Sequence, residues 1–284
     1  MSQELTGKRL ADVPIVVLDT ETTGLDPRLG HRIVEIAALR LENWRPVAEI
    51  SQLVQPGRKL DPGASRVHGI YDEDLVGQPA FAEIAGDLLA LMDGALLVAH
   101  NAAFDAGFVD MEFHLGGYAR DNHGPMPANP WLCTLQLARR RFHFGRNNLG
   151  AVARQLNIRV DTAHRALADV YTTAAILKRM SEQLQAQGVE TVGDLFQAQG
   201  GPIYAPPPAQ PVALPPLLAD ALASGGDLLI EYAASRGSSR RVITPKYVTT
   251  GSSGAYVVAY CHLRHEQRTF RLDRILAMAP VGDR

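Results

Sequence analysis

The chain has 284 residues, 46% of them hydrophobic and 20% charged, which gives enough apolar material for one large domain and one small one. Its 28 basic residues nearly balance its 30 acidic residues, so the bulk charge indicates no polyanionic partner, and a site for one would have to be built locally. Cys133 and Cys261 lie in apolar runs without a CxxC spacing, which argues against a disulfide framework or a zinc site and predicts core thiols. No apolar stretch approaches the ~18 residues that span a bilayer, so we expect a cytoplasmic protein that does not bind membranes.

Runs of β-branched apolar residues predict the first strands. Residues 15–18 form such a run, which ends in polar Asp19 and is followed by the breaker residues 22–27. Residues 32–41 and 47–54 are two more strand-like runs, close enough in sequence to pair with the first as an antiparallel meander.

The apolar pattern then changes to helical spacing. It predicts a helix over residues 81–92, a short strand over 95–99 and a second helix over 104–115. The later helices are expected at 135–141, 149–156 and 166–184, the last preceded by Asp161 and Thr162 as N-caps. Strands that alternate with helices in this way predict an α/β domain over residues 1–199.

The composition changes again near residue 200. Residues 200–216 contain seven prolines among small residues, which predicts an extended linker with little buried surface. Residues 217–284 carry a charge balance of +3 and are expected to form a small all-β barrel. Its predicted strands are 228–232, 241–247, 255–261, 269–272 and 275–278.

Two carboxylates stand at the end of the first strand. Asp19 and Glu21 flank one residue, and the period of two along a strand sends both side chains to the same face. Two neighbouring anions repel each other, so the pair is either solvated or held by a cation, and a hard divalent ion with oxygen ligands is the most economical cation.

Three more polar residues follow later apolar segments. Asp105 comes after the strand at 95–99, at the edge of an α/β sheet where ligand sites gather. Asp169 and His164 are five residues apart, which on a regular helix would separate them by ~140° around the axis. We therefore expect Asp169 on the helix as a fixed metal ligand and His164 in the loop that enters it.

Four segments together resemble a known family. LDTETTGLD, VHGI, LVAHNAAFD and HRALADV are similar to the motifs of the DEDDh exonucleases, the family of the bacterial proofreading epsilon subunit, over roughly residues 12–184. The resemblance implies a ribonuclease H-like mixed sheet flanked by helices. It also implies 3′-to-5′ removal of nucleotides from single-stranded DNA or RNA ends, in repair or in proofreading with a DNA polymerase as a partner.

The same resemblance assigns the site. The implied ligands of two Mg²⁺ or Mn²⁺ ions are Asp19, Glu21, Asp105 and Asp169, with His164 as the general base. In-line phosphodiester hydrolysis needs such a set, since one cation activates water, the second stabilises the leaving oxygen, and a group with a pKa near 6.5 accepts the proton. The residues implied to contact the terminal nucleotide are Thr22, Gly24, Leu25, His68 and Phe104.

The C-terminal segment resembles another module. Over about residues 217–280 it is similar to a WYL domain, a small SH3-like β-barrel, although the name-giving tripeptide is replaced by residues 255–257, Ala-Tyr-Val. Several arginines of this module could hold phosphates by forked hydrogen bonds, or could simply form a solvated surface. They are Arg240, Arg241, Arg268, Arg271 and Arg274.

Two other functions remain open at this point. In the first, the protein is a regulator whose β-module senses a nucleotide or nucleic acid while the exonuclease-like domain docks to a polymerase. In the second, the protein is a one-metal phosphatase that acts on a nucleotide through an aspartate nucleophile, a scheme that has no use for the later His164 and Asp169.

Overall fold

The structure, a computed structural model, describes residues 5–118, 126–159, 165–205, 214–234, 237–251 and 254–281. The chain forms two compact units. The first consists of Met1–Gly24 with Arg32–Pro207, and the second of Leu25–His31 with Pro208–Arg284.

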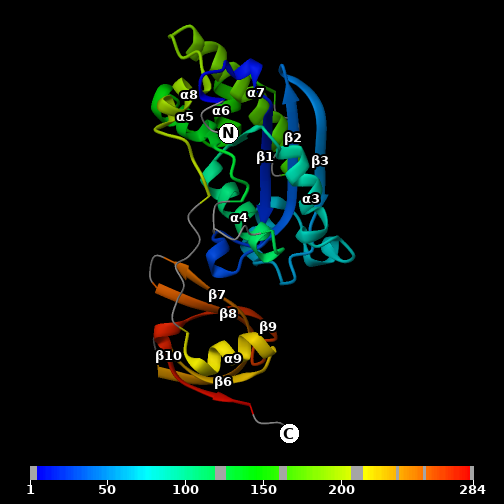
Figure 1. Ribbon diagram of the computed structural model, residues 1–284, viewed down its shortest axis with the longest axis vertical. Helices are drawn as coiled ribbons and strands as arrows, with labels where there is room; N and C mark the ends of the chain where they lie inside the picture. The colour runs from blue at the N-terminus through cyan, green and yellow to red at the C-terminus, as the bar shows by residue number, and fades with distance from the viewer. Residues whose placement is uncertain are drawn as a thin grey trace. The chain divides into compact units, whose positions relative to one another are not determined.

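The first unit is built on a five-stranded mixed sheet with the order β3-β2-β1-β4-β5. Strands β1, β2 and β3 are labelled side by side in Figure 1. Strands β1 to β3 pair antiparallel, whereas β4 and β5 run parallel to β1. The predicted meander is therefore confirmed, and β5 is a strand that the apolar pattern did not reveal. The bounds are β1 Ile15–Thr22, β2 Ile33–Glu42, β3 Arg45–Leu53, β4 Leu96–Ala99 and β5 Trp131–Cys133.

Helices cover both faces of this sheet. Apolar side chains of α3 and α4 pack with one face in one core cluster, and those of α5 to α8 pack with the other face in a second cluster (Figure 1). The 3₁₀ turns η1 Leu10–Asp12 and η3 Asp72–Leu75 also belong to this unit, whereas η2 Pro27–Leu29 lies in the segment Leu25–His31 of the second unit. The helices are α2 Pro62–His68, α3 Phe81–Met92, α4 Ala102–Leu115, α5 Thr134–Arg141, α6 Leu149–Gln155, α7 Ala166–Gln185 and α8 Val192–Gln199.

Strand β1 carries the alternation that positions the site. Ile15 and Val17 face the core cluster that contains α7, and Val16 and Leu18 face the cluster that contains α4. Because side chains alternate along a strand, Asp19 and Glu21 continue the row that faces α7. Thr20 continues the row that faces α4.

The turn after β4 determines where α4 begins. His100 lies between Thr134 Oγ1 at 2.8 Å and the Asn147 carbonyl oxygen at 2.9 Å, which ties the strand end to its neighbours. Asn101 then takes a left-handed conformation with φ of 105° as the N-cap of α4, and Asp105 lies in the first turn. At the start of α7 the N-cap position belongs to Arg165, while Asp161 and Thr162, the expected caps, lie outside the described residues.

The second unit holds an antiparallel sheet with the order β10-β6-β7-β8-β9. All five predicted strands are present, but β9 and β10 lie at opposite edges, so a closed SH3-like barrel is not confirmed for the described residues. The five strands pack around one apolar core. Their bounds are β6 Leu228–Ala234, β7 Gly237–Gly251, β8 Gly254–Cys261, β9 Glu266–Arg271 and β10 Ile275–Pro280, with η4 Leu272–Arg274 before β10.

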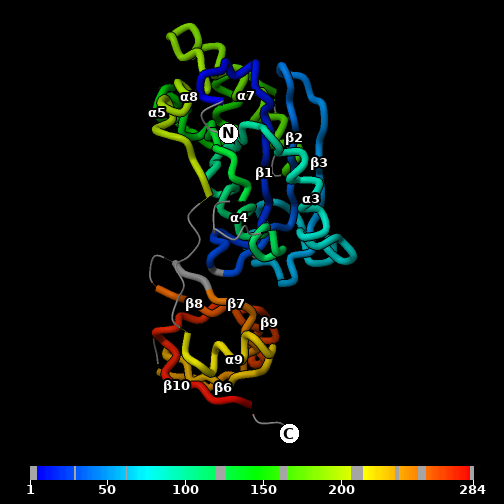
Figure 2. Tube along the Cα trace, in the orientation of Figure 1, coloured from blue at the N-terminus to red at the C-terminus, as the bar shows by residue number. Residues whose placement is uncertain are grey.

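The proline-rich stretch is partly structured. Helix α9, Pro216–Ser224, was not predicted, and it lies beside the strands of the second unit (Figure 2). Its Leu218 and Ala221 are buried in the core of that unit. At the other end of the stretch, Ile203 pairs with Trp131, with N···O distances of 2.8 and 3.1 Å. Several of these prolines therefore flank packed segments; Pro216 itself opens a helix, where a missing N–H costs nothing.

The two cysteines and the length and polarity of the helices bear on two further expectations. Cys133 and Cys261 are both buried and free, as expected for core thiols. In the part of the chain that the structure describes, no helix is long and apolar enough to cross a membrane.

We predict that Asn101→Ala lowers the free energy of unfolding by about 1 kcal/mol, because alanine is more strained at positive φ than asparagine is. Asn101→Gly should unfold like the wild type or at higher urea, since glycine adopts this conformation without strain. The Asn101 side chain makes no capping hydrogen bond, so the two variants isolate the backbone effect. Equal destabilisation in urea titrations would show that the amide side chain, and not the backbone, matters here.

Candidate active site

Three carboxylates meet beside the end of β1. Oxygen atoms of Asp19, Glu21 and Asp169 all lie within 4.8 Å of one another, and each residue is half-buried. Asp19 and Glu21 come from β1, and Asp169 comes from the first turn of α7, which packs on that face of the sheet. The structure thus brings together two segments that are far apart in the sequence.

Asp105 approaches from the opposite side through α4. Its Oδ1 accepts hydrogen bonds from the Thr20 backbone N–H at 3.1 Å and from the Thr20 hydroxyl at 2.9 Å. It is almost completely buried and is not one of the three acids that share the 4.8 Å group. Its charge nevertheless acts on Asp19, and Thr20 fixes its orientation.

Burial and neighbouring negative charges raise the pKa values of acids in this site. Burial first, and then the charges of Asp105 and Glu21, raise the pKa of Asp19 well above its ordinary value. Burial and the neighbouring Asp169 raise the pKa of Glu21 from 4.5 to about 8. Burial raises the pKa of Asp105 to about 7, although the hydrogen bonds from Thr20 act in the opposite direction.

These shifts indicate what the site is suited to bind. Gathering carboxylates in a half-buried place costs free energy because like charges repel and lose water. A divalent cation with oxygen ligands would remove both costs, since carboxylates are the donors that such hard ions prefer. The donor set of Asp19, Glu21 and Asp169, with Asp105 beside them, therefore fits a divalent metal.

The predicted general base cannot be placed. His164 lies outside the described residues, one position before Arg165 at the N-cap of α7. Its role stays a prediction from the sequence.

The residues expected to contact the substrate are in varied environments. The Thr22 hydroxyl donates to the Gly24 carbonyl oxygen at 2.6 Å, so it is engaged in its own turn, and Leu25 is 85% exposed. His68 is buried, and its Nδ1 accepts from the Ile70 N–H at 3.1 Å. Phe104 is half-buried against Phe108, with ring centroids 4.8 Å apart. None of these positions tests the predicted contacts.

Two charged residues beside the acids were not predicted. Glu35 of β2 is buried and pairs directly opposite Glu21 of β1. Its carboxylate binds the guanidinium of Arg165, with a shortest N···O distance of 2.9 Å. The sequence held one signal for Glu35, a single acid inside the otherwise apolar run 33–39. Such a residue needs a partner when the strand is buried.

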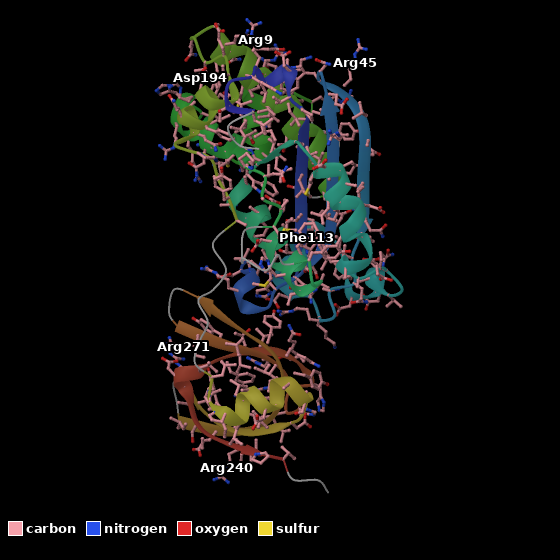
Figure 3. The ribbon with its side chains drawn as sticks, viewed as in Figure 1. Arg9, Arg45, Phe113, Asp194, Arg240 and Arg271 are labelled. Atoms are coloured by element: carbon pink, nitrogen blue, oxygen red, sulfur yellow. The ribbon has the colours of Figure 1, made fainter. Side chains whose placement is uncertain are left out.

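The arginines of the second unit do not form one patch. Arg268 pairs with Glu266 at 3.0 Å, and Arg271 forms a forked pair with Asp273. Arg241 lies over the Phe270 ring, 5.9 Å from its centroid. Arg240 and Arg271 project on different sides of this unit (Figure 3). Arg240 and Arg274 are exposed and form no ion pair within 4.0 Å among the described residues, although the charge of Arg274 acts on its neighbour Asp273.

We predict that the metal-free protein loses stability as pH rises from about 4.5 to about 8. Native Glu21 keeps a proton in this range that the unfolded chain has released, so the unfolding free energy falls with pH. One such proton contributes a slope of at most about 1.4 kcal/mol per pH unit.

Urea unfolding in EDTA across this range measures the slope. Glu21→Gln should make the profile less steep, while Asp19 and Asp105, whose pKa values are also raised, still contribute a slope. Glu42→Gln, at an exposed residue of β2, should leave the profile unchanged. A profile as steep in Glu21→Gln as in the wild type would contradict the assignment.

Two protein families match different parts of the chain. The profile of the exonuclease family RNase_T matches residues 16–177, and that of the WYL domain matches residues 215–280. The chain is 37% identical over 196 residues to the DNA polymerase III subunit epsilon of Escherichia coli strain K12, which covers 65% of this chain and 78% of that protein. It is 32% identical over 181 residues to the 3′-5′ exonuclease DinG of Bacillus subtilis strain 168, covering 63% of this chain but 19% of that protein.

Solved structures agree with this relationship. A structure of exonuclease X in complex with 5′ overhanging duplex DNA superposes with a TM-score of 0.50 and 29% identity, over 66% of this chain and 99% of that one. Exonuclease I of E. coli in complex with a dA16 oligonucleotide has a TM-score of 0.55 at 16% identity, over 87% of this chain and 55% of that one, which shows the fold alone. With a matching profile over more than half of its length and a cluster of acids where that family's motifs lie, the chain belongs to the exonuclease family.

Proposed function

We propose that this exonuclease is a metal-dependent 3′-to-5′ enzyme that acts on single-stranded DNA ends and releases nucleoside 5′-monophosphates. The observation that carries the proposal is the group of Asp19, Glu21 and Asp169 oxygens within 4.8 Å, with Asp105 adjacent. Four carboxylates would balance the charge of two divalent cations, and we propose Mg²⁺ or Mn²⁺.

Each acid has a defined part in this scheme. Asp19 and Glu21 project from one rigid strand, so their spacing is set by the strand period. Asp169 extends from α7 toward these two acids, and two hydrogen bonds from Thr20 fix the orientation of the Asp105 carboxylate. When bound, the cations would activate a water molecule and stabilise the departing 3′ oxygen.

His164 supplies the proton acceptor in the proposal. The water's proton passes to its imidazole as the new P–O bond forms and the bond from phosphorus to the 3′ oxygen breaks. A neutral imidazole with an ordinary pKa near 6.5 is available for this at neutral pH. Thr22, Gly24, Leu25, His68 and Phe104 are proposed to hold the terminal nucleotide.

The biological setting is proposed from the relatives. Polymerase III epsilon subunits support proofreading beside a polymerase, and the DNA in the exonuclease X structure supports DNA as the substrate. RNA would be distinguished by a contact to the 2′ hydroxyl. The regulator without nuclease activity is the competing function, and the same assay separates the two.

Digestion of a 5′-labelled single-stranded DNA oligomer tests the proposal directly. We expect a ladder that shortens from the 3′ end with Mg²⁺ or Mn²⁺ and intact substrate in EDTA. Asp19→Ala should lower the rate on the order of 10³-fold or more, because it removes several kcal/mol of transition-state stabilisation. His164→Ala should lower it by about 10²- to 10⁴-fold.

Glu42→Gln, at an exposed acid of β2, is the control and should digest like the wild type. Substrate that stays intact with every cation would overturn the proposal and favour the regulator. A parallel RNA oligomer would establish the preferred sugar.

We further propose that the WYL module adds affinity for the nucleic-acid strand. The candidate contacts are the exposed Arg240 and Arg274, since Arg268 and Arg271 form ion pairs with Glu266 and Asp273. A tethered second contact raises the effective concentration of the strand at the active site without adding catalytic groups.

Arg240→Ala and Arg274→Ala should each weaken single-stranded DNA binding and reduce the salt dependence of log K by about one phosphate contact. The rate at saturating DNA should not change. Arg45→Ala, at an exposed position on β3 of the first unit, is the matched control. Binding and salt dependence equal to the wild type in both variants would exclude these arginines as contacts.

A further inference from the structure

A buried acid lies directly across from one of the proposed metal ligands. Glu35 of β2 and Glu21 of β1 are register partners in the antiparallel pair. Directly opposite residues of such a pair share one face with Cβ atoms about 4.5–5.5 Å apart, and like charges there are destabilising. Glu35 is only 3% exposed, so a partner must offset its charge.

That partner is the beginning of α7. The Glu35 carboxylate accepts from Arg165 Nη2 at 2.9 Å and from Arg165 Nε at 3.1 Å, a forked contact. Its second oxygen accepts from the Ala166 backbone N–H at 3.1 Å. Arg165 makes no side-chain cap of its own, so Glu35 satisfies an N–H at this helix end from another strand.

The same turn of α7 presents Asp169. The Asp169 N–H donates to the Arg165 carbonyl oxygen at 3.1 Å, which closes the first helical turn. The contacts that hold Arg165 and Ala166 therefore also hold the backbone position from which the Asp169 side chain extends. Its oxygen must stay within 4.8 Å of oxygens on β1 for the three acids to act together.

We propose that Glu35 and Arg165 are positioning residues that join the first turn of α7 to β2 and so hold Asp169 at metal-binding distance from Asp19 and Glu21. This inference rests on the proposed metal site. The contacts of Glu35 are with α7, and the ligand that they position is Asp169.

The chain contains a matched pair for comparison. Glu112 of α4 is also buried, and it accepts the Arg32 guanidinium at 2.6 and 2.8 Å and the Ile33 backbone N–H at 3.0 Å. This pair is also a buried glutamate held by a guanidinium and a backbone N–H, but Arg32 donates to both Glu112 oxygens, and the pair joins β2 to the far end of α4. Disrupting it should cost stability without displacing a metal ligand.

Two variants distinguish a positioning role of this pair from a purely electrostatic effect on metal binding. Glu35→Gln leaves the Arg165 cation near the site, which repels metal ions, whereas Arg165→Gln leaves an extra anion, which attracts them. An effect of charge alone would weaken Mn²⁺ binding in the first variant and strengthen it in the second. If the pair positions Asp169, both should weaken it, by about 10- to 100-fold, the usual effect of losing a residue that supports a ligand.

The test is calorimetric titration of the full-length protein with Mn²⁺ in the absence of DNA, together with thermal unfolding of each metal-free variant. We expect Glu35→Gln and Arg165→Gln to bind Mn²⁺ more weakly, while Glu112→Gln lowers the unfolding temperature but keeps the wild-type affinity. Arg165→Lys keeps the charge at a side chain that is 55% exposed, so it should fold even where Glu35→Gln does not. It should bind Mn²⁺ with an affinity between those of the wild type and Arg165→Gln.

Two results would overturn the inference. One is an Mn²⁺ affinity in the Glu35 and Arg165 variants equal to that of the wild type or of Glu112→Gln, and the other is tighter binding by Arg165→Gln. Failure of the wild type to bind Mn²⁺ would instead contradict the proposed metal site, so the two failures are distinguishable.

Discussion

Mutual repulsion among carboxylates at the end of β1 is the constraint around which the first unit is organised. Asp19 and Glu21 cannot move apart because the strand period fixes both on one face. Asp169 and Asp105 then approach from helices on opposite faces of the sheet. A fold that holds these anions together needs rigid elements whose packing stabilises the folded state by more than the repulsion between the anions destabilises it.

The surrounding structure supplies that rigidity through several separate contacts. Apolar side chains of α7 pack against β1 and β2, and those of α4 pack on the other face. Thr20 directs Asp105, and Glu35 with Arg165 fixes the first turn of α7. Each of these contacts fixes the orientation of one carboxylate, so the site depends on the residues that support the acids as much as on the acids themselves.

The balance of charges around the acids has a chemical consequence. The pKa values of Glu21, about 8, and Asp105, about 7, mean that the metal-free site holds protons near neutral pH. The pKa of Asp19 is raised in the same direction. Since a metal ion binds the deprotonated carboxylates, its binding releases those protons and becomes tighter as pH rises. The site is therefore built to favour the cation-bound state at neutral to mildly alkaline pH.

Much of the fold could be predicted from local patterns, because the spacing of apolar residues reports on burial within a single element. The helix predicted at residues 81–92 is α3 with the same bounds, and the first meander has the predicted pairing. The misses were elements too short or too atypical for a periodic signal. They are β5 and the helices α2, α8 and α9. The SH3-like barrel expected for the second unit is not confirmed, since β9 and β10 lie at opposite edges of its sheet in the described residues.

The sequence by itself determined which acids could form a site, since Asp19 and Glu21 are neighbours on one strand and family-like motifs surround Asp105 and Asp169. Only the tertiary structure decided that Asp169 joins the β1 pair while Asp105 bonds Thr20. It alone revealed the contact between Glu35 and Arg165, which are 130 residues apart in the chain. The physical reason is that side-chain direction follows from local geometry, whereas contacts between elements depend on sheet register and helix packing, which no local period encodes.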